Sequence, residues 1–287
     1  MSDKVIGVIG GSGLYSMDAL VDVKSVKVTT PFGEPSDEYI TGRLGNVKMV
    51  FLPRHGREHK LLPSEINYRA NIYGMKKLGV EWIISVSAVG SMKEEIHPGD
   101  MVIVDQFFDR TKSRASTFLG SGVAGHVEFG DPVCGDLSRV LYDAAVGAGA
   151  KVHRGGTYLC IEGPQFSTRA ESNIYRSWGV DVIGMTNIPE AKLAREAEIC
   201  YATIALSTDY DCWHEEEESV TVEMILETIS KNVAMARKII IGAVEDKAFE
   251  DRSCGCGSAM QYAAVTQRDA IPEKTREDLS IILGKYL

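Results

Sequence analysis

Seven apolar runs rich in β-branched residues recur along the chain, and they constrain its fold more than any other feature of the sequence. The runs are 5–10 (VIGVIG), 47–52 (VKMVFL), 82–87 (WIISVS), 101–105 (MVIVD), 157–163 (TYLCIEG), 180–185 (VDVIGM) and 200–209 (CYATIALSTD). Several are apolar at nearly every position, which is typical of strands that are covered on both faces of a sheet.

Helical patterns lie between these runs, at 64–79, 135–150, 166–179, 188–199 and 221–244. Strands that alternate with helices predict an α/β fold in which helices flank one mixed or mostly parallel central sheet. The 287 residues contain no repeat and no convincing linker, so we expect a single domain over residues 1–287. Residues 109–130, rich in Gly, Ser and Thr, predict a long functional loop. Residues 250–287 predict a C-terminal arm that ends in a short helix.

The charge and hydropathy of the chain disfavour several classes of partner. A formal net charge of −9 opposes binding to phosphate backbones, so nucleic acid is not an expected partner. No apolar run approaches the roughly 20 residues that a helix needs to cross a bilayer, so no membrane is expected either. The N-terminal MSDKVIGVIG lacks a basic segment with a long apolar stretch behind it, which argues against a signal peptide. We therefore expect a cytoplasmic protein with small-molecule ligands.

The six cysteines are Cys134, Cys160, Cys200, Cys212, Cys254 and Cys256. In a reducing cytosol, free thiols are the default expectation. The CGC at 254–256 does not have the spacing of a zinc-binding C-x₂₋₄-C pair, and no matching His/Cys pair follows it, so no metal site is predicted. Two interpretations of this CGC stay open: an inert pair of thiols, or a redox-active or stabilising disulfide.

The first apolar run ends in a glycine cluster, VIGVIGGSGL at 5–14. Gly10, Gly11 and Gly13 do not form G-x-G-x-x-G, no acidic residue follows at the distance that a dinucleotide ribose requires, and no G-K-[ST] is present. Ser12 beside free backbone amides suits a small anion. A simple turn without a ligand is the alternative, and these residues alone do not decide between the two.

Polar residues follow several of the predicted strands at the end where α/β sheets bind ligands. Arg54 and His55 follow the strand at 47–52, and an arginine can bind two phosphate oxygens with its planar fork. Ser87 ends the strand at 82–87, and Thr186 follows the run at 180–185. These residues predict an anion site, with a solvated basic turn as the alternative interpretation of the segment around Arg54.

Two carboxylates, Asp209 and Asp211, end the last strand with one residue between them. In an extended chain they face the same side. Like charges in a cleft raise each other's pKa, which would make one of them a proton donor at neutral pH. A surface turn, a helix cap or a metal site would use the same D-x-D pattern.

Taken in order along the chain, these segments resemble the trimeric purine nucleoside phosphorylase family over roughly residues 5–245. The motifs that carry the resemblance are GGSGL, TPFGEPSD, RHGREH, NYRANIYG, GSMKEEIHPGD, DQFFDRT, IEGPQFSTRAES, GMTNIPEA, EAEICYA and TDYDCW. The resemblance implies a homotrimer or a dimer of trimers, inorganic phosphate as co-substrate, and no cofactor.

The resemblance also implies the roles of individual residues. The phosphate site maps onto Ser12, Arg54, His55, Ser87, Ala88 and Thr186, with Ser12 at a position where threonine is often found. The nucleoside site maps onto His126, Phe166, Ser167, Met185, Asp209, Tyr210, Asp211, Val222, Ile225 and Leu226, with Met185 at the ribose and His126 and the arm reaching across the trimer interface. A Cys134–Cys200 disulfide is implied by heat-stable relatives.

The implied reaction is phosphorolysis at C1′ of a nucleoside, with Asp209 as the general acid at N7 of the departing purine. Asp211 would accept from a 6-amino group, which favours adenine over hypoxanthine. An apolar pocket from Val222, Ile225 and Leu226 favours a 5′-methylthio group over a hydroxyl. We therefore expect 5′-methylthioadenosine as the substrate and a role in purine and methionine salvage.

Three alternatives to this expectation remain. The first is a phosphorylase for inosine and guanosine, or for methylthioinosine. The second is a dinucleotide-dependent oxidoreductase, and the third is a non-catalytic nucleoside-binding protein. The missing third glycine argues against the second, and the predicted anion site argues against the third.

Overall fold

The computed structural model describes residues 4–214, 222–246, 249 and 252–287. Within them, eleven strands form one mixed sheet. The strands are β1 (Val5–Gly10), β2 (Leu20–Val26), β3 (Tyr39–Leu44), β4 (Val47–Pro53), β5 (Trp82–Ser91), β6 (Met101–Ile103), β7 (Gln106–Arg110), β8 (Val152–Arg154), β9 (Thr157–Ile161), β10 (Val182–Gly184) and β11 (Cys200–Tyr210). All seven predicted strands are present, so the mixed α/β sheet is confirmed.

The long strand β5 pairs with three other strands, β1, β10 and β11. One of its edges pairs with β11 in parallel along the whole strand. Its other edge pairs with β1 in parallel up to Ser85 and then with β10 in antiparallel fashion from Gly90. The strands β1 and β10 therefore leave residues 86–89 of that edge uncovered, and the ends of both strands point at this gap.

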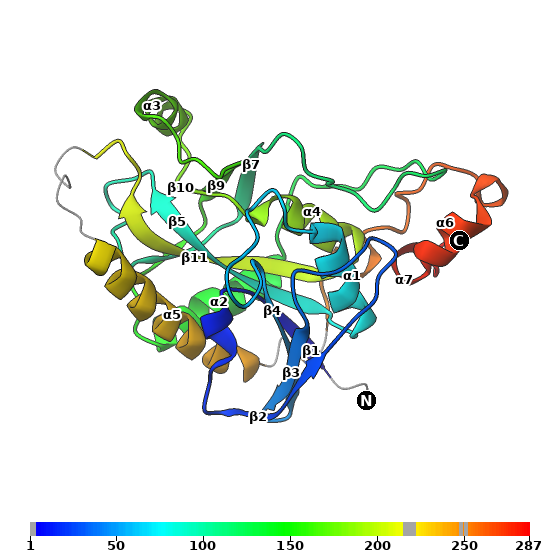
Figure 1. The fold of residues 1–287 in the computed structure, drawn as a ribbon, viewed down its shortest axis with the longest axis horizontal. Helices are drawn as coiled ribbons and strands as arrows, with labels where there is room; N and C mark the ends of the chain where they lie inside the picture. The colour runs from blue at the N-terminus through cyan, green and yellow to red at the C-terminus, as the bar shows by residue number, and fades with distance from the viewer. Residues whose placement is uncertain (1–3, 215–221, 247–248, 250–251) are drawn as a thin grey trace.

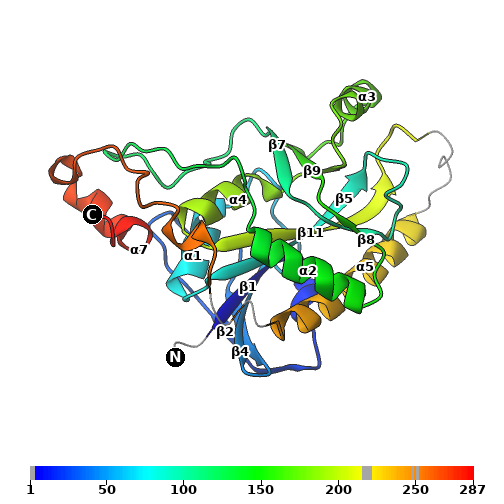
Figure 2. The same ribbon diagram turned by 180° about the vertical axis from the view of Figure 1, so that it is seen from behind.

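The described residues form five longer helices, four of which cover the two faces of the sheet. The helices are α1 (Tyr68–Lys77), α2 (Gly135–Gly147), α3 (Arg169–Ser177), α4 (Asn187–Glu196) and α5 (Val222–Val244). In Figures 1 and 2, α1 and α4 lie on one side of the sheet, α2 and α5 lie on the other, and α3 stands away from the body. Neighbouring residues of a strand point into opposite layers: in β1, Ile9 packs with α1 and α4 and Val8 packs with α2 and α5.

Side-chain caps explain where two of the helices begin. α1 starts at Tyr68 rather than at the predicted Ser64, because the Asn67 side chain accepts a hydrogen bond from the Ala70 amide. α3 begins with a capping box, in which Thr168 and Glu171 bond each other's backbone amides.

Four strands were not predicted. β2 and β3 form an antiparallel edge of the sheet, and β2 is exposed at most positions, so it lacks the apolar run that reveals a buried strand. β7 occupies Gln106–Arg110 and takes the first two residues of the predicted loop 109–130. β8 has only three residues, too few to show the alternation of apolar and polar residues that predicts a strand.

The described part of the C-terminal arm, residues 252–287, contains two 3₁₀ turns and two short helices, α6 (Glu273–Asp278) and α7 (Ser280–Leu283). Its backbone pairs with the loop 109–130 through Gly125 and Ala264, so loop and arm project together from the body (Figure 1). α7 packs back against α1 with Leu283 fully buried. Among the helices of the described residues, none combines the length and apolar character that crossing a membrane requires.

The packing of α1 against β3 generates a stability prediction. A Cβ at Gly74 would lie 2.1 Å from the hydroxyl of Tyr39, a buried group that donates to the Asn71 carbonyl at 2.8 Å. We expect Gly74→Ala to lower the free energy of unfolding by about 1–3 kcal/mol, the usual cost of overpacking. Urea unfolding measures this change.

The matched control is Gly147→Ala at the end of α2, where a Cβ would meet no atom within 4 Å. This variant should gain up to about 1 kcal/mol. Equal effects of the two substitutions would contradict the proposed contact.

Candidate active site

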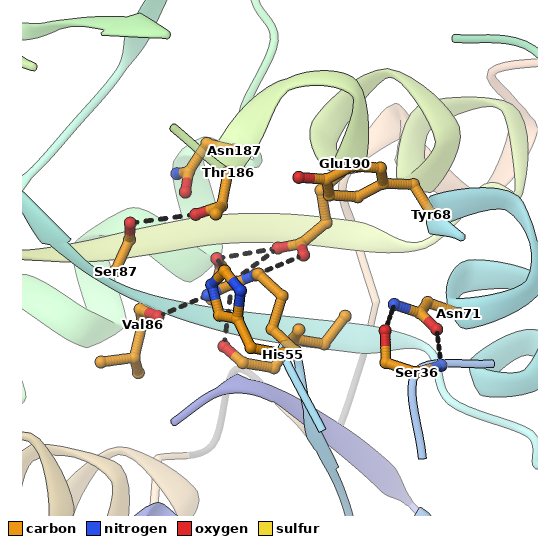
Figure 3. Close-up of polar contacts among 12 residues, drawn as sticks. Ser36, His55, Tyr68, Asn71, Val86, Ser87, Thr186, Asn187 and Glu190 are labelled. Carbon is orange, nitrogen blue, oxygen red and sulfur yellow. Dashed lines mark hydrogen bonds and ion pairs between the residues drawn. The ribbon is translucent and has the colours of Figure 1, made fainter. Parts of the chain in front are cut away.

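The residues predicted to bind an anion lie around the gap along β5. The amide of Arg54 donates to the Gly10 carbonyl at 2.9 Å, which fixes the chain after β4 next to the end of β1. Thr186 follows β10, and its Oγ1 lies 3.2 Å from Oγ of Ser87. Figure 3 shows His55, Ser87 and Thr186 gathered around this point.

Arg54 is buried and forms a bidentate ion pair with Glu190 of α4. Its Nε donates to Oε2 of Glu190 at 2.8 Å, and its Nη2 donates to Oε1 at 2.9 Å. Burial alone would lower the pKa of Arg54, but the Glu190 carboxylate more than offsets it and raises that pKa. The fork that the sequence analysis assigned to phosphate oxygens is therefore bound to a carboxylate.

The remaining donors of Arg54 reach the neighbouring strands. Nη1 donates to the Val86 carbonyl at 2.9 Å, and Nη2 donates to Oγ of Ser85 at 2.7 Å. Ser85 and Tyr201 in turn donate to Oε1 of Glu190, each at 2.9 Å. These bonds hold the guanidinium in one orientation, with Nη1 at the residue that precedes Ser87.

Three hydroxyls line the gap beside Arg54. Oγ of Ser87 lies 3.2 Å from both the Tyr158 hydroxyl and Oγ1 of Thr186, and all three residues are buried. Burial raises the pKa of Tyr158 to about 12, so it remains a neutral hydroxyl at physiological pH. Each hydroxyl carries one proton that can be directed toward an anion.

His55 lies at the rim of the same gap. Its Nδ1 is 2.8 Å from the Leu61 carbonyl, so Nδ1 carries the proton and Nε2 of the neutral ring is an acceptor. The ring stacks on His59 with centroids 4.4 Å apart. Burial lowers the pKa of His55 to about 4, so the ring is neutral at pH 7.

The two aspartates at the end of β11 lie together, as predicted from their spacing. A bulge in the pairing of β5 with β11 falls between Ser207 and Asp209. After it, Asp209 Oδ1 and Asp211 Cβ lie 3.2 and 3.5 Å from the position of a Cβ at Gly90. Ser167 donates to Oδ2 of Asp211 at 2.8 Å. The glycine thus leaves room for two carboxylates beside the gap in the sheet.

Met185 is half-buried between the hydroxyls and the loop before α3. Its Sδ lies 2.7 Å from the position of a Cβ at Gly163, a residue with φ of +71°. The backbone carbonyl of Met185 accepts from Nη1 of Arg114 at 2.6 Å, and the same nitrogen donates to the Ile188 carbonyl at 2.7 Å. Arg114 of the long loop therefore holds both ends of the segment that carries Thr186.

Of the remaining predicted residues, those whose side chains the structure describes are exposed or contact residues outside this cluster. Ala88 is exposed beside Ser87, and the side chain of Phe166 is 82% exposed. Tyr210 stacks on His214, with ring centroids 4.5 Å apart, and donates to the Glu94 carbonyl. His126 is exposed on the projecting loop, where it lines a shallow groove of about 450 Å³. The side chains of Ser12, Val222, Ile225 and Leu226 lie outside the described residues.

Sequence reasoning missed three residues that shape the site. Glu190 sits in a helical pattern, where a carboxylate ordinarily faces solvent, although its place in an apolar segment after Pro189 was an available signal. Arg114 and Tyr158 belong to a predicted loop and a predicted strand, and neither position carries a pattern that marks a buried polar role.

The chain is similar to known proteins along most of its length. Residues 5–245 match the model of the phosphorylase superfamily. The chain is 66% identical to the S-methyl-5'-thioadenosine phosphorylase of Geobacter sulfurreducens, over 99% of this chain and 100% of the relative. It is 59% identical to the same enzyme of Koribacter versatilis, over 98% and 96% of the two chains.

Solved structures are similar over most of the chain. A methylthioadenosine phosphorylase from an antarctic soil metagenomic library superposes with a TM-score of 0.95 at 49% identity, covering 99% of this chain and 100% of the other. A mutant adenosine/methylthioadenosine phosphorylase of Schistosoma mansoni in complex with methylthioadenosine has a TM-score of 0.81 at 38% identity, covering 93% and 100%.

The depressed pKa of His55 predicts a specific pH dependence of stability. Between pH 6.5 and about 4 the unfolded chain binds a proton at His55 that the folded protein does not, so this residue makes stability fall as pH falls. We expect His55→Gln to have a smaller difference in unfolding midpoint between pH 7 and pH 5 than the unmodified protein. The exposed neighbour His59 supplies the control, His59→Gln, and equal differences in all three proteins would contradict the assignment.

Proposed function

This chain belongs to the phosphorylase superfamily, and on that premise we propose how its residues cleave 5′-methylthioadenosine with phosphate to give adenine and 5-methylthioribose 1-phosphate. The observation that carries the proposal is the placement of a hydroxyl-lined anion pocket and a pair of carboxylates on either side of one gap in the sheet. Phosphate would occupy the first position and the purine the second, with the ribose between them.

Phosphate binds to the hydroxyls of Ser87 and Thr186 and to donors of the turn at Ser12. Arg54 contributes through Nη1, because Glu190 holds its other two nitrogens. Ala88 is exposed at the gap and offers its backbone amide there. The anion is thus bound by oriented dipoles and one guanidinium edge, an arrangement that positions the nucleophile under C1′.

His55 supports the phosphate as a neutral acceptor. With Nδ1 bonded to the Leu61 carbonyl, Nε2 can accept a hydrogen bond from a protonated phosphate oxygen. This contact favours the hydrogen phosphate form with its charge directed away from His55 and toward the donors. A charged imidazolium is not required.

The sugar and its 5′ substituent lie between the two ends of the site. Met185 packs against the ribose face, and its soft thioether suits an apolar contact. By the resemblance to the family, Val222, Ile225 and Leu226 would form the apolar 5′ pocket, which would exclude a hydroxyl without a partner.

The carboxylates act on the purine. Asp209 donates a proton or a hydrogen bond to N7, which neutralises the leaving group as the glycosidic bond breaks. Asp211 accepts from the 6-amino group, and the hydrogen bond from Ser167 holds it in place. A 6-oxo purine would face the carboxylate with an acceptor, so adenine is favoured over hypoxanthine. Phe166 and Tyr210 complete the rim of the base site.

The assembly we propose is a homotrimer or a dimer of trimers in the cytoplasm, with inorganic phosphate as co-substrate and no cofactor. The side chains of Phe166 and Tyr262 are 82% and 89% exposed in the single chain. In a trimer, the loop with His126 and the paired arm would cover a neighbour's site and bury such residues.

A substrate comparison tests the proposed base site. Release of adenine from 5′-methylthioadenosine should require phosphate, and kcat/KM should exceed that for inosine at equal phosphate concentration, because of the carboxylate acceptor at Asp211. A coupled assay for the free base measures both rates. Preference for inosine would overturn the role of Asp211, and turnover without phosphate would overturn the anion site.

Removing the general acid tests the mechanism separately. Asp209→Ala should lower kcat by about 10²–10⁴-fold, the range typical of a lost general acid, while circular dichroism stays unchanged. Asp143→Ala is the control, since this exposed carboxylate pairs with Arg139 on α2. Normal kcat in Asp209→Ala would remove this residue from the mechanism.

A further inference from the structure

Four cysteines gather on the side of the sheet that α2 and α5 cover. This group, the four-thiol cluster, consists of Cys134, Cys200, Cys254 and Cys256. Their Sγ atoms all lie within 4.8 Å of one another, and the Sγ atoms of Cys200 and Cys254 are 3.3 Å apart. The reaction proposed above uses none of these residues.

Three separate segments bring the sulfurs together. Cys134 is the N-cap of α2, and its amide donates to the Tyr201 carbonyl at 2.8 Å. Cys200 is the first residue of β11. Cys254 and Cys256 flank Gly255 at the start of a 3₁₀ turn in the arm. Backbone bonds of the core thus hold two of the thiols in place, and the arm supplies the other two.

The spacing of the sulfurs suits tetrahedral coordination better than covalent pairing. Zinc–sulfur bonds of about 2.3 Å in a tetrahedron place the sulfurs about 3.8 Å apart. The Sγ atoms of Cys200 and Cys254 are 3.3 Å apart, and no two sulfurs of the cluster are more than 4.8 Å apart, so small shifts would reach this value. A disulfide would hold two sulfurs at about 2.05 Å and divide four of them into two pairs. Here each sulfur instead has the other three as neighbours.

The surroundings are suited to a negatively charged metal centre. Nε of Arg252 donates to Sγ of Cys200 at 3.2 Å, and the positive end of α2 lies at Cys134. Cys134, Cys200 and Cys256 are buried, whereas Cys254 is partly exposed and leaves a route from solvent. Thiolates select soft ions such as Zn²⁺ over Mg²⁺ or Ca²⁺.

We propose that the four-thiol cluster binds one Zn²⁺ ion and thereby fastens the C-terminal arm to the core. Binding replaces four thiol protons by one divalent cation, which leaves the centre with a charge of −2 beside Arg252. No oxidant takes part.

A second set of contacts near the cluster also attaches the C-terminal arm to the core. Buried Glu198, which precedes β11, accepts at Oε1 from the Met260 amide at 3.0 Å and from the Tyr286 hydroxyl at 2.6 Å. Arg252 also donates to the Glu198 carbonyl. The zinc centre and Glu198 together would fix both the beginning and the end of the arm.

Metal analysis of the full chain tests the proposal. The protein is purified with a reductant and without added metal or chelator, and its metals are measured by inductively coupled plasma mass spectrometry. We expect about one zinc per chain, released when a mercurial titrates the thiols. Cobalt added to the stripped protein should produce the intense visible absorption of tetrahedral thiolate coordination.

Variants separate the cluster from the other cysteines. Cys254→Ser/Cys256→Ser should lose at least nine-tenths of the zinc and have a lower melting temperature, whereas Cys212→Ser, at an exposed position, should keep both. The zinc content of the unmodified protein tests the proposal even if the double variant does not fold. A metal-free chain with six free thiols, intact-mass evidence of disulfides among the four, or a metal other than zinc would each overturn the proposal.

Discussion

The ion pair between Arg54 and Glu190 holds the candidate site together. It joins the end of β4 to α4, and its hydrogen bonds to Ser85 and Tyr201 extend it to β5 and β11. Both charges are buried, with side chains 3% and 0% exposed, so each requires the other. Loss of one partner of such a pair costs about 3–5 kcal/mol, because the remaining charge stays desolvated. The position of Thr186 depends on this pair, since α4 carries Glu190 and begins next to Thr186.

The central strands were predictable because they are buried on both faces, and such strands are apolar without interruption. The exposed edge strand β2 was not, because its polar residues resemble a loop. Strand ends also located Arg54, Ser87, Thr186 and the two aspartates, since the ends of neighbouring strands meet at one edge of an α/β sheet.

Partners that lie far apart in the sequence could not be predicted in the same way. Glu190 is 136 residues from Arg54, and a helical carboxylate carries no local sign that it is buried. The thiols of Cys134 and Cys200 meet the C-G-C segment only after α2, β11 and the arm have folded, so a rule based on local spacing rejects a metal site there. In both cases the decisive information is a contact between segments, which spacing does not contain.

The electrostatics of the anion pocket follow from these contacts. Glu190 neutralises the buried arginine, and His55 is neutral at pH 7, so the pocket has little net positive charge from these three residues. In the proposed mechanism, a phosphate dianion is then held mainly by hydroxyl dipoles and by one edge of the guanidinium. Cationic side chains paired with every phosphate oxygen would stabilise the bound phosphate as strongly as the transition state. Such uniform binding would not raise kcat. Oriented neutral donors would position the phosphate while leaving it reactive. On this proposal the strongest charge effect acts on the purine, where Asp209 would meet the charge that develops as the glycosidic bond breaks.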